Sequence, residues 1–374
     1  MNNLSYWEHK YFLEGIDHLV IGGGIVGLST AYYLKQKFPK QRVVVLERDV
    51  FSAGASSKNA GFACFGSPSE LAADFKSMPE HEVVELVQMR FEGLKLLRAL
   101  LGDKAIGYNP EGGVELFRDE DRASAEYCLS QLNLWNSMLE DVIGFRPYEP
   151  SSAYLAFNGK SSFHYSIAIN GEGSIQTGLM LRSLRTLVGE SGVELFCGAP
   201  VSAIHTEDKN PVVQYLGTQI IPSKLYICTN GFARELLPSL KVNAVRNQVL
   251  VTAPLNTILP DGTYHLDEGY VYFRALGKRL LIGGFRNKDQ ETESTSEFGI
   301  TDKIQSELEQ FIYNYITQEE FSVDHRWSGI LGVGDTKYPI IERLSDRIYV
   351  GVRMGGMGVA IGNLIGKKLS ELSN

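Results

Sequence analysis

The sequence predicts an α/β fold, α+β overall, in which a parallel-sheet unit and an antiparallel-sheet unit alternate along the chain. Near the N-terminus, a strand, a glycine turn, a helix and a second strand follow one another within about 30 residues, which is typical of a βαβ unit. Residues 242–286 instead contain several short β-rich runs. No repeat or low-complexity linker separates these two kinds of region, so we expect the antiparallel-sheet unit to be interleaved with the parallel-sheet unit.

Composition limits the classes of protein to which the chain can belong. Its 374 residues are 44% apolar and 21% charged, which is ordinary for a globular protein with two or three cores. No stretch approaches the roughly 20 apolar residues of a membrane helix, and no signal-peptide pattern is present. We therefore expect a cytoplasmic protein without a membrane span. The net charge of -8 argues against general nucleic-acid binding, and the four widely spaced cysteines suggest neither a metal site nor a disulfide framework.

Periodicity places the elements in order along the chain. Continuous apolar runs that end in a turn predict buried strands, and apolar residues near a 3.6 period predict helices. The expected helices are 24–34, 77–101, 121–141, 178–188, 301–315 and 359–372, and the expected strands are 17–22, 42–47, 112–117, 193–197, 225–229, 248–252, 270–273, 280–284 and 346–351.

The glycine turn after the first strand carries the strongest chemical signal. Gly22, Gly24 and Gly27 satisfy GxGxxG between a strand and a helix, and Glu47 ends the next strand. In this pattern Gly22 makes the tight turn, Gly24 lets the backbone approach a pyrophosphate and Gly27 lets the helix pack on the sheet. The pyrophosphate would lie at the positive end of the helix, and Glu47 would accept hydrogen bonds from a ribose hydroxyl. A Rossmann-like dinucleotide site is therefore expected.

Two further glycine-rich segments favour FAD over NAD. Residues 54–61 form a small polar stretch that could lie along a cofactor extending beyond its nucleotide half. Residues 353–358 precede the last helix, whose positive N-terminus suits an isoalloxazine that gains negative charge on reduction. In that helix, Gly362 and Gly366 form a small-residue face suited to close packing. Glycine thus marks two cofactor loops at opposite ends of the chain.

On these motifs the sequence resembles the FAD-dependent amine and amino-acid oxidoreductases, the group of glycine oxidase, sarcosine oxidase and D-amino-acid oxidase. The Thr229-Asn230-Gly231 turn after a strand is the fourth match, and the resemblance runs from residue 17 to 372. It implies that Val201 contacts the adenosine half of FAD through its backbone. The predicted cofactor-binding residues are Gly22, Gly24, Ile25, Val26, Gly27, Glu47, Arg48, Ser56, Ser57, Lys58, Asn59, Ala60, Gly61, Val201, Thr229, Asn230, Gly231, Arg353, Gly355, Gly356, Met357 and Gly358.

The resemblance also implies a discontinuous FAD-binding domain under an antiparallel-sheet substrate domain. We assign residues 1–76, 150–238 and 326–374 to the first domain and residues 77–149 and 239–325 to the second. Members with covalent FAD carry a cysteine before the last strand, but residues 328–339 contain none, so we expect non-covalent FAD. Leu281 aligns where sarcosine oxidases have a lysine that promotes reaction with oxygen, which leaves O2 or another electron acceptor open.

The resemblance implies oxidation of a C–N bond, in which a hydride leaves the carbon next to nitrogen and the imine is hydrolysed. Arginine suits a substrate carboxylate because it is planar, bidentate and always charged. Family members use tyrosine and arginine from the antiparallel sheet, so Tyr272 and Arg274 are the first candidates. Arg286 and Arg353 are further candidates, with an exposed surface position as the alternative for each arginine. His265 could assist amine deprotonation or be a structural histidine.

Three functions remain open from the sequence. The first is oxidation of a small amine or amino acid. The second is action on the aminomethyl side chain of a modified tRNA base, which relatives of this fold perform and against which the negative charge counts. The third is a catalytically silent flavoprotein that keeps FAD for stability.

Overall fold

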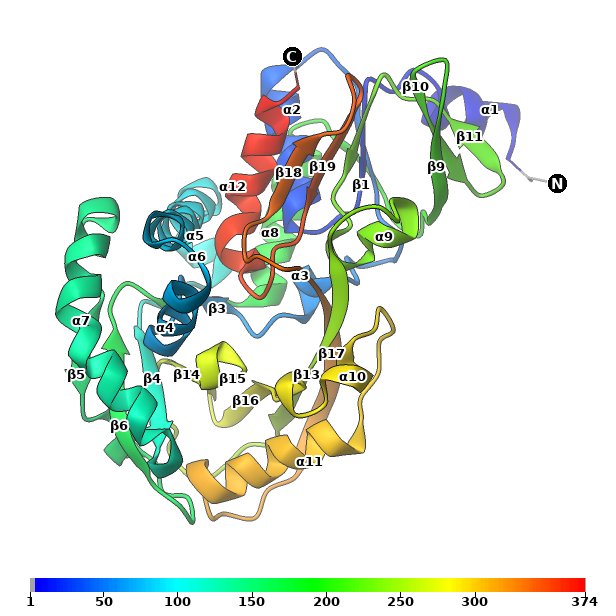
Figure 1. Ribbon diagram of the computed structural model, residues 1–374. Coiled ribbons are helices and arrows are strands. Elements are labelled where there is room, and N and C mark those ends of the chain that lie inside the picture. The colour runs from blue at the N-terminus through cyan, green and yellow to red at the C-terminus, as the bar shows by residue number, and fades with distance from the viewer. Residues whose placement is uncertain (1–3, 374) are drawn as a thin grey trace.

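The computed structural model describes residues 4–373 and contains two large sheets, one at each end of the molecule (Figure 1). A parallel sheet with β1 (His18–Ile21), β12 (Lys224–Ile227) and β19 (Ile348–Val352) lies in the upper half of the view. A mainly antiparallel sheet with β13 (Asn243–Thr252), β15 (Val271–Leu276) and β16 (Arg279–Gly284) lies in the lower half. Helix α3 (Ala55–Lys58) and the long strand β17 (Val323–Val333) lie between the two halves, where they contact each other. The mixed α/β architecture agrees with the predicted fold class.

The six-stranded sheet is parallel except at one edge. Its strand order is β18-β19-β12-β1-β2-β8, and only the β18–β19 pair is antiparallel. Every residue of β1 and β2 is buried, which explains why these strands are continuous apolar runs and not alternating ones. The strands are β1 (His18–Ile21), β2 (Val43–Leu46), β8 (Glu194–Phe196), β12 (Lys224–Ile227), β18 (Ile340–Arg343) and β19 (Ile348–Val352).

One face of this sheet is covered by helices from distant parts of the chain. Residues of α2 (Ile25–Lys37), α5 (Glu80–Leu101), α8 (Thr177–Glu190) and α12 (Gly358–Glu371) join the strands in one hydrophobic core. Helix α12 packs closely on α2, because a Cβ at Gly366 would lie 2.5 Å from the Cβ of Ser29. The predicted small-residue packing face of α12 is therefore confirmed.

The opposite face carries elements that the sequence did not reveal. A three-stranded sheet of β9 (Val201–Glu207), β10 (Asn210–Tyr215) and β11 (Thr218–Ile220) packs there through a second apolar cluster. Exposed residues alternate irregularly along β9, so its sequence lacks a buried face from which a strand could be predicted. The short helices α1 (Tyr6–Glu8), η1 (His9–Leu13) and α9 (Ala233–Leu236) adjoin this sheet.

The eight-stranded sheet has the order β17-β13-β16-β15-β14-β4-β6-β5, and its β14–β4 pair is parallel. Helix α11 covers β13 and β16, and helix α7 lies against β6 and β5. The elements are β4 (Gly113–Arg118), β5 (Tyr148–Ser151), β6 (Phe163–Ile169), β13 (Asn243–Thr252), β14 (Thr263–Leu266), β15 (Val271–Leu276), β16 (Arg279–Gly284), α7 (Arg122–Ile143) and α11 (Asp302–Phe311).

Short elements complete the chain between these layers. They are β3 (Phe62–Ala63), β7 (Gly173–Ser174), α4 (Pro68–Ser77), α6 (Asp103–Ile106), α10 (Gln290–Glu293), η2 (Asp119–Asp121), η3 (Ala153–Ala156), η4 (Asn230–Phe232), η5 (Asp267–Gly269), η6 (Arg286–Lys288) and η7 (Ile312–Ile316). The helix expected at 77–101 begins at Glu80 because Met78 and Pro79 are extended. The helix expected at 301–315 becomes a π-turn after Phe311.

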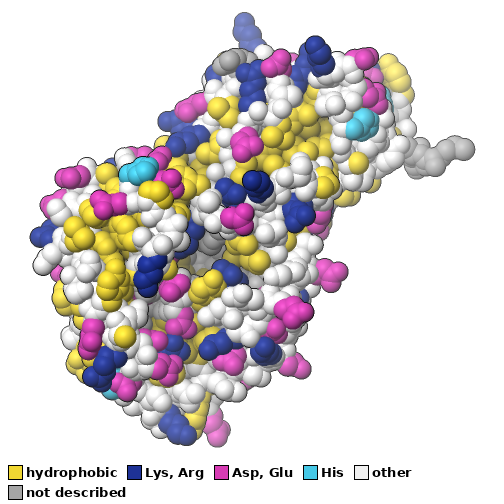
Figure 2. Space-filling view, viewed as in Figure 1, with side chains coloured by type: hydrophobic (Ala, Val, Ile, Leu, Met, Phe, Trp, Pro, Cys, Tyr) yellow, Lys and Arg dark blue, Asp and Glu magenta, His cyan; other side chains and the backbone are white. Residues whose placement is uncertain are grey.

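The predicted domain boundaries stay a prediction, and one strand departs from them. β6 lies in the segment 150–238 that we assigned to the FAD-binding domain, but it pairs with β4 and β5 in the eight-stranded sheet. Within residues 4–373 no helix combines the length and the apolar character that crossing a membrane requires. On the face shown in Figure 2, acidic and basic side chains are interspersed.

Candidate cofactor site and adjoining cavity

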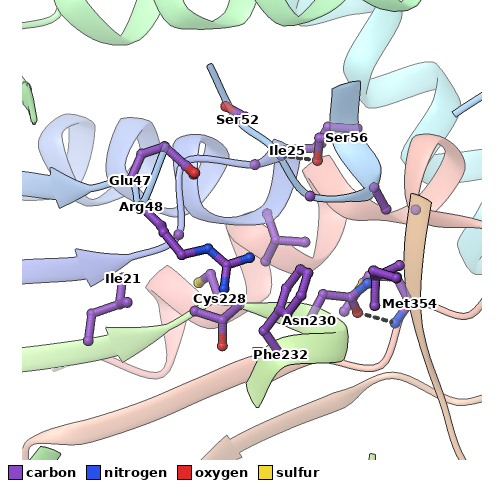
Figure 3. Close-up of a pocket in the computed structure, with 18 of the residues that line it drawn as sticks. Ile21, Ile25, Glu47, Arg48, Ser52, Ser56, Cys228, Asn230, Phe232 and Met354 are labelled. Carbon is purple, nitrogen blue, oxygen red and sulfur yellow. Dashed lines mark hydrogen bonds between the residues drawn. The ribbon is translucent and has the colours of Figure 1, made fainter. Parts of the chain in front are cut away.

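A cavity of about 160 Å³ lies at the carboxyl ends of β1, β2 and β12 (Figure 3). This is the edge at which open α/β sheets bind their ligands. The motif residues predicted for the cofactor contribute much of its wall. Those that line it are Gly22, Gly24, Ile25, Val26, Glu47, Arg48, Ser56, Asn59, Val201, Thr229, Asn230, Gly355, Gly356 and Gly358.

The glycine turn has the geometry expected from its sequence. Gly22 has a φ of 107°, and a Cβ there would lie 2.6 Å from the carbonyl oxygen of Cys228. A Cβ at Gly27 would lie only 1.8 Å from the carbonyl oxygen of Gly22, so α2 can approach the turn only with glycine at this position. Gly27 therefore shapes the cavity without lining it.

The carboxylate of Glu47 is held in place at the cavity wall. One oxygen accepts the N–H of Gly23 at 2.8 Å, and the other accepts the N–H of Asp49 at 3.1 Å. Carboxylate oxygens have lone pairs beyond these two bonds, so Glu47 can still accept bonds from ribose hydroxyls. Beside it, the guanidinium of Arg48 stacks 4.2 Å from the ring centre of Phe232 (Figure 3).

The predicted cofactor loops contact one another through hydrogen bonds. The hydroxyl oxygen of Ser56, in the second loop, accepts the N–H of Ile25 at 2.9 Å, at the start of α2. The Asn230 side chain accepts the N–H groups of Arg353 and Met354, each at 3.1 Å. Figure 3 shows both links on the cavity wall. One link joins residues 25 and 56 and the other joins residue 230 to residues 353 and 354, and the packing of α12 on α2 connects the two into one frame around the cavity.

A larger cavity of about 500 Å³ adjoins the first. The two cavities share residues of α3 and its C-cap, of β17, of the loop before α12 and of the first turn of α12, which are Ala55, Asn59, Leu331, Met354, Gly355, Gly356 and Val359. Of the predicted cofactor residues, Lys58, Ala60, Met357 and Arg353 line the larger cavity. Ser57, Gly61 and Gly231, like Gly27, line neither cavity and belong to the supporting turns.

The eight-stranded sheet contributes His265, Tyr272 and Asn247 to the wall of the larger cavity. His265 of β14 lies opposite Glu115 of β4 and Tyr272 of β15, so these three residues are cross-strand neighbours. The Tyr272 hydroxyl accepts a hydrogen bond from the Asn247 amide at 3.0 Å. Burial raises the pKa of Tyr272, which keeps its hydroxyl protonated and able to donate.

Arg286 fits the predicted role of a carboxylate anchor. It lines the larger cavity, and its guanidinium lies 4.5 Å from the ring centre of Tyr270. Within residues 4–373 it has no ion pair with an acidic side chain. A cavity wall therefore presents a guanidinium that is stacked on an aromatic ring and free to bind an anion.

The structure does not support the same role for Arg274. Its Nε donates to the Ala60 carbonyl at 2.8 Å, its Nη2 donates to the Ile175 carbonyl at 3.0 Å, and it lines neither cavity. Burial lowers the pKa of Arg274 to about 10. Alternation along β15 did place it on the face of Tyr272, but the segment around Ala60 covers that end of the face. Arg274 is therefore a structural link between β15 and this segment.

Arg353 also uses its guanidinium for the fold. Its side chain donates to the carbonyls of Tyr338 and Lys241 at 2.8 and 3.1 Å and to the Thr336 hydroxyl at 3.2 Å. It lines the larger cavity, and its φ of 66° marks a sharp turn before α12. Burial lowers the pKa of Arg353. The predicted substrate role does not fit these contacts, because they occupy the group that would bind a carboxylate.

His265 lines the larger cavity and has a partner that the sequence did not reveal. Its Nε2 lies 3.0 Å from a carboxylate oxygen of Glu172, and both side chains are buried. Glu172 sits in the glycine-flanked turn between β6 and β7, and Glu115 lies inside β4 between the apolar residues Val114 and Leu116. A charged residue inside a buried strand, Glu115, was the signal available in the sequence. Only the sheet register shows that Glu115 lies beside His265.

A cluster of four charged side chains also lines the larger cavity. Glu70 of α4 pairs with Arg90 of α5 at 3.1 Å and with Lys337 at 3.0 Å, and Lys337 also pairs with Asp74 at 2.6 Å. Burial acts to raise the pKa of Glu70, but the two cations outweigh it and lower that pKa to about 2. Asp74 has a raised pKa because of burial and the nearby Glu70. The cluster is largely neutralised within the protein.

Comparison with known proteins gives the family of the chain. The model of the family described as DAO, FAD dependent oxidoreductase, matches residues 17–372. The chain belongs to this family of FAD-dependent oxidoreductases. Its dependence on FAD and its oxidoreductase class therefore agree with the predictions from the two glycine loops.

Relatives in the family are distant in sequence. The chain is 22% identical to probable oxidoreductase OrdL of Haemophilus influenzae over 99% of this chain and 90% of that protein. It is 25% identical to gamma-glutamylputrescine oxidoreductase of Escherichia coli, over 95% and 83%. The structure of glycine oxidase from Geobacillus kaustophilus superposes with a TM-score of 0.76 at 19% identity, covering 96% of this chain and 95% of that chain. The superposition establishes the shared fold.

The smaller cavity fits the FAD on which the family depends. The buried hydroxyl of Thr229 lines it and has no hydrogen-bond partner within residues 4–373, so a ligand can satisfy this group. The first turns of α2 and α12 border the cavity, and neither N-cap residue supplies a side-chain bond to its helix. Two helix N-termini provide amide donors and a positive field for the anionic groups of FAD.

Proposed function

We propose that this protein oxidises the C–N bond of a small amine or amino acid. The observation that carries the proposal is the position of Arg286 and Tyr272 in the larger cavity, which shares wall residues with the smaller cavity formed by the cofactor motifs. A substrate there would lie next to the inner end of the cofactor. When bound, FAD would accept the hydride that leaves the substrate carbon.

The FAD would be divided between the two cavities. Glu47 would accept the ribose hydroxyls, Gly24 and Ser56 border the approach of the phosphates to α2, and Val201 lines the nucleotide end. In the loop before α12, Gly355 and Gly356 line both cavities, Met357 lines the larger one and Gly358 lines the smaller one. This loop and the N-terminus of α12 would contact the isoalloxazine ring of FAD. Each of these roles is our proposal from position and chemistry.

The protein groups in the larger cavity would orient the substrate. Arg286 would bind a carboxylate in a bidentate manner, and the Tyr272 hydroxyl would donate a further hydrogen bond to it. Phe62, Val249 and Leu331 supply apolar wall around these groups. Such walls exclude water and strengthen the charge pairing with Arg286.

The names of similar proteins support an amine or amino-acid substrate without selecting one. They include gamma-glutamylputrescine oxidoreductase, glycine oxidase and, at a TM-score of 0.75, L-proline dehydrogenase of P. horikoshii. The electron acceptor stays open between O2 and another oxidant. Leu281, which aligns at the lysine position of sarcosine oxidases, is buried in an apolar cluster with Ala60 and Val249. A cytoplasmic location also stays a prediction.

We further propose that FAD is bound without a covalent link. Residues 328–339 carry no cysteine. Cys64 does line the larger cavity, but it is buried beside the sulfur of Met357, and burial raises the pKa of its thiol far above the ordinary value. A thiol that stays protonated is a poor nucleophile for attachment. Acid treatment should therefore release all of the flavin from the protein.

An anaerobic reduction screen tests the proposed function. The purified holoprotein should be yellow, and at least one of glycine, sarcosine, D-amino acids or polyamine derivatives should bleach its flavin absorbance. Reduction by tRNA bearing the modified base, and by none of the free amines, would replace our proposal with the tRNA alternative. Absence of reduction by every compound would favour the silent flavoprotein, and a colourless protein that binds NAD would overturn the cofactor assignment.

A further inference from the structure

His265 and Glu172 form a buried pair that opens onto the larger cavity. His265 is 5% exposed and Glu172 is 1% exposed, and the imidazole Nε2 lies 3.0 Å from Oε2 of Glu172. The second ring nitrogen, Nδ1, has no hydrogen-bond partner in residues 4–373, although the residue lines the cavity. Because a carboxylate accepts but does not donate, Glu172 selects the tautomer with hydrogen on Nε2. The lone pair of Nδ1 is then available.

The backbone holds Glu172 in a fixed position for this contact. Its other oxygen, Oε1, accepts the N–H of Phe65 at 3.1 Å, so the carboxylate spans from the β3–α4 connection to β14. Gly113 of β4 leaves the required space, because a Cβ there would lie 2.2 Å from Oε2 of Glu172. The carboxylate cannot move away from His265 without losing the Phe65 bond.

Titratable and charged groups face His265 from each element packed around it. Glu172 lies in the turn after β6, Glu115 on β4 and Tyr272 on β15, while Glu70 approaches from α4 with its partners Arg90 and Lys337. The ring of Phe62, on β3, packs edge-on at 5.2 Å. Burial acts to lower the pKa of His265, but the three carboxylates outweigh it and raise that pKa. His265 is thus a stronger base than an ordinary histidine.

We propose that His265 removes the ammonium proton of the substrate through Nδ1, and that Glu172 is the positioning residue that holds the imidazole for this step. The proposal rests on the proposed amine oxidation. In the step, one ammonium N–H bond breaks, its electron pair stays on the substrate nitrogen, and a new N–H bond forms at Nδ1. The product is a neutral amine beside an imidazolium that is paired with Glu172. The amine lone pair is then available to form the C–N π bond as the hydride leaves.

The first test is the pH dependence of flavin reduction by the best amine in the screen, measured anaerobically in single turnovers. The wild-type rate should rise with pH through the pKa of His265, because only the neutral imidazole accepts a proton. His265→Gln should lower the plateau rate about 100-fold. Glu172→Gln should move the rise to lower pH by about 1 pH unit and lower the plateau about 10-fold, since the imidazole loses its negative partner and its orientation.

A matched pair on the surface provides the control. His205 and Glu207 lie 2.9 Å apart and are exposed on β9, so Glu207→Gln removes an equivalent carboxylate away from both cavities. It should leave the rate and its pH profile unchanged. If Glu172→Gln binds FAD and gives a wild-type profile, the proposal is overturned. If no amine reduces the wild type, the proposed function fails. The second test then decides whether Glu172 holds the imidazole of His265 as we propose.

The second test needs only the wild-type holoprotein and no substrate. Nitrogen-15 NMR of the seven labelled histidines reports the tautomer of each ring. His265 should carry its hydrogen on Nε2 when neutral and should titrate above the ordinary value for histidine. A neutral Nδ1–H tautomer, or titration below the ordinary value, would contradict the proposal even if every variant failed to fold.

Discussion

The two cavities differ in the kind of wall that would recognise a ligand. The smaller cavity is built from turns, glycines and the first turns of α2 and α12, with Glu47 as its buried carboxylate. The larger cavity is walled by side chains of the eight-stranded sheet, such as His265 and Tyr272, and by Arg286 of η6 just beyond β16. Where backbone forms the wall, side chains that point away from the ligand can vary, but a Cβ added at the contact is not tolerated. Where side chains form the wall, one substitution can change which ligand is bound. Ligand binding in the smaller cavity should thus be sensitive to added volume, and ligand binding in the larger cavity should be sensitive to a change of charge.

The largest effect is expected from adding one carbon to the backbone wall. Gly27→Ala places a Cβ 1.8 Å from the Gly22 carbonyl, so α2 must shift and the turn must open. We expect loss of bound FAD and destabilisation by about 3 kcal/mol or more, since the clash is with backbone. Flavin content and thermal unfolding measure both. Gly189→Ala, in α8 with nothing within 4 Å of the added carbon, is the matched control and should retain FAD.

In the larger cavity, Arg286→Met should impair binding of carboxylate substrates while FAD stays bound. The lost charge-assisted hydrogen bonds predict a rise of about 10- to 100-fold in KM, from about 1.5–3 kcal/mol. Steady-state kinetics with a carboxylate substrate and a decarboxylated analogue measure the effect, which the analogue should not show. Arg182→Met, at an exposed position of α8, controls for loss of positive charge. Equal KM values for Arg286→Met and wild type would remove Arg286 from the binding site.

Arg274, on β15 of the eight-stranded sheet, provides the opposite test. Arg274→Met should lower stability by about 1–3 kcal/mol, because the buried carbonyls of Ala60 and Ile175 lose their donor. Denaturant unfolding of the holoprotein measures this change. KM should stay within a few-fold of wild type when the variant is assayed below its unfolding temperature. A large change in KM with unchanged stability would instead restore Arg274 as the carboxylate anchor.

The smallest effect concerns the pH dependence of stability at Glu70. Its carboxyl has a pKa of about 2 in the folded protein against 4.5 as the ordinary value. The folded state therefore holds the proton less tightly, so the stabilisation is fully present above about pH 4.5 and is lost as the pH falls toward 2. Glu70→Gln should flatten the unfolding free energy over this interval when wild type and variant are compared in denaturant. An unchanged slope would show that the ion pairs with Arg90 and Lys337 contribute nothing.

The difference between a cavity built from local turns and one built from a paired sheet also explains which residues the sequence could predict. The residues around Gly22, Glu47, Ser56 and Gly356 follow from local motifs, since each loop joins a strand to a helix within a few residues. The partners in the larger cavity depend on sheet register. His265 and Glu172 are 93 residues apart in sequence and meet because β4 pairs in parallel with β14 on one side and antiparallel with β6, which precedes Glu172, on the other. Alternation assigned Arg274 to the correct face, but it gave no information on which segment covers that face.

The link between Asn230 and the loop before α12 has a consequence for biosynthesis. The frame around the smaller cavity needs Ile25 and Ser56, which leave the ribosome early, and Met354, which is made tens of seconds later at ordinary synthesis rates. Strand β1 also pairs with β12, and β12 pairs with β19, so the parallel sheet is incomplete for the same interval. Until β12 is made, the nascent chain exposes the unpaired backbone N–H and C=O groups along one edge of β1, and this edge must stay protected from other strands before the flavin is loaded.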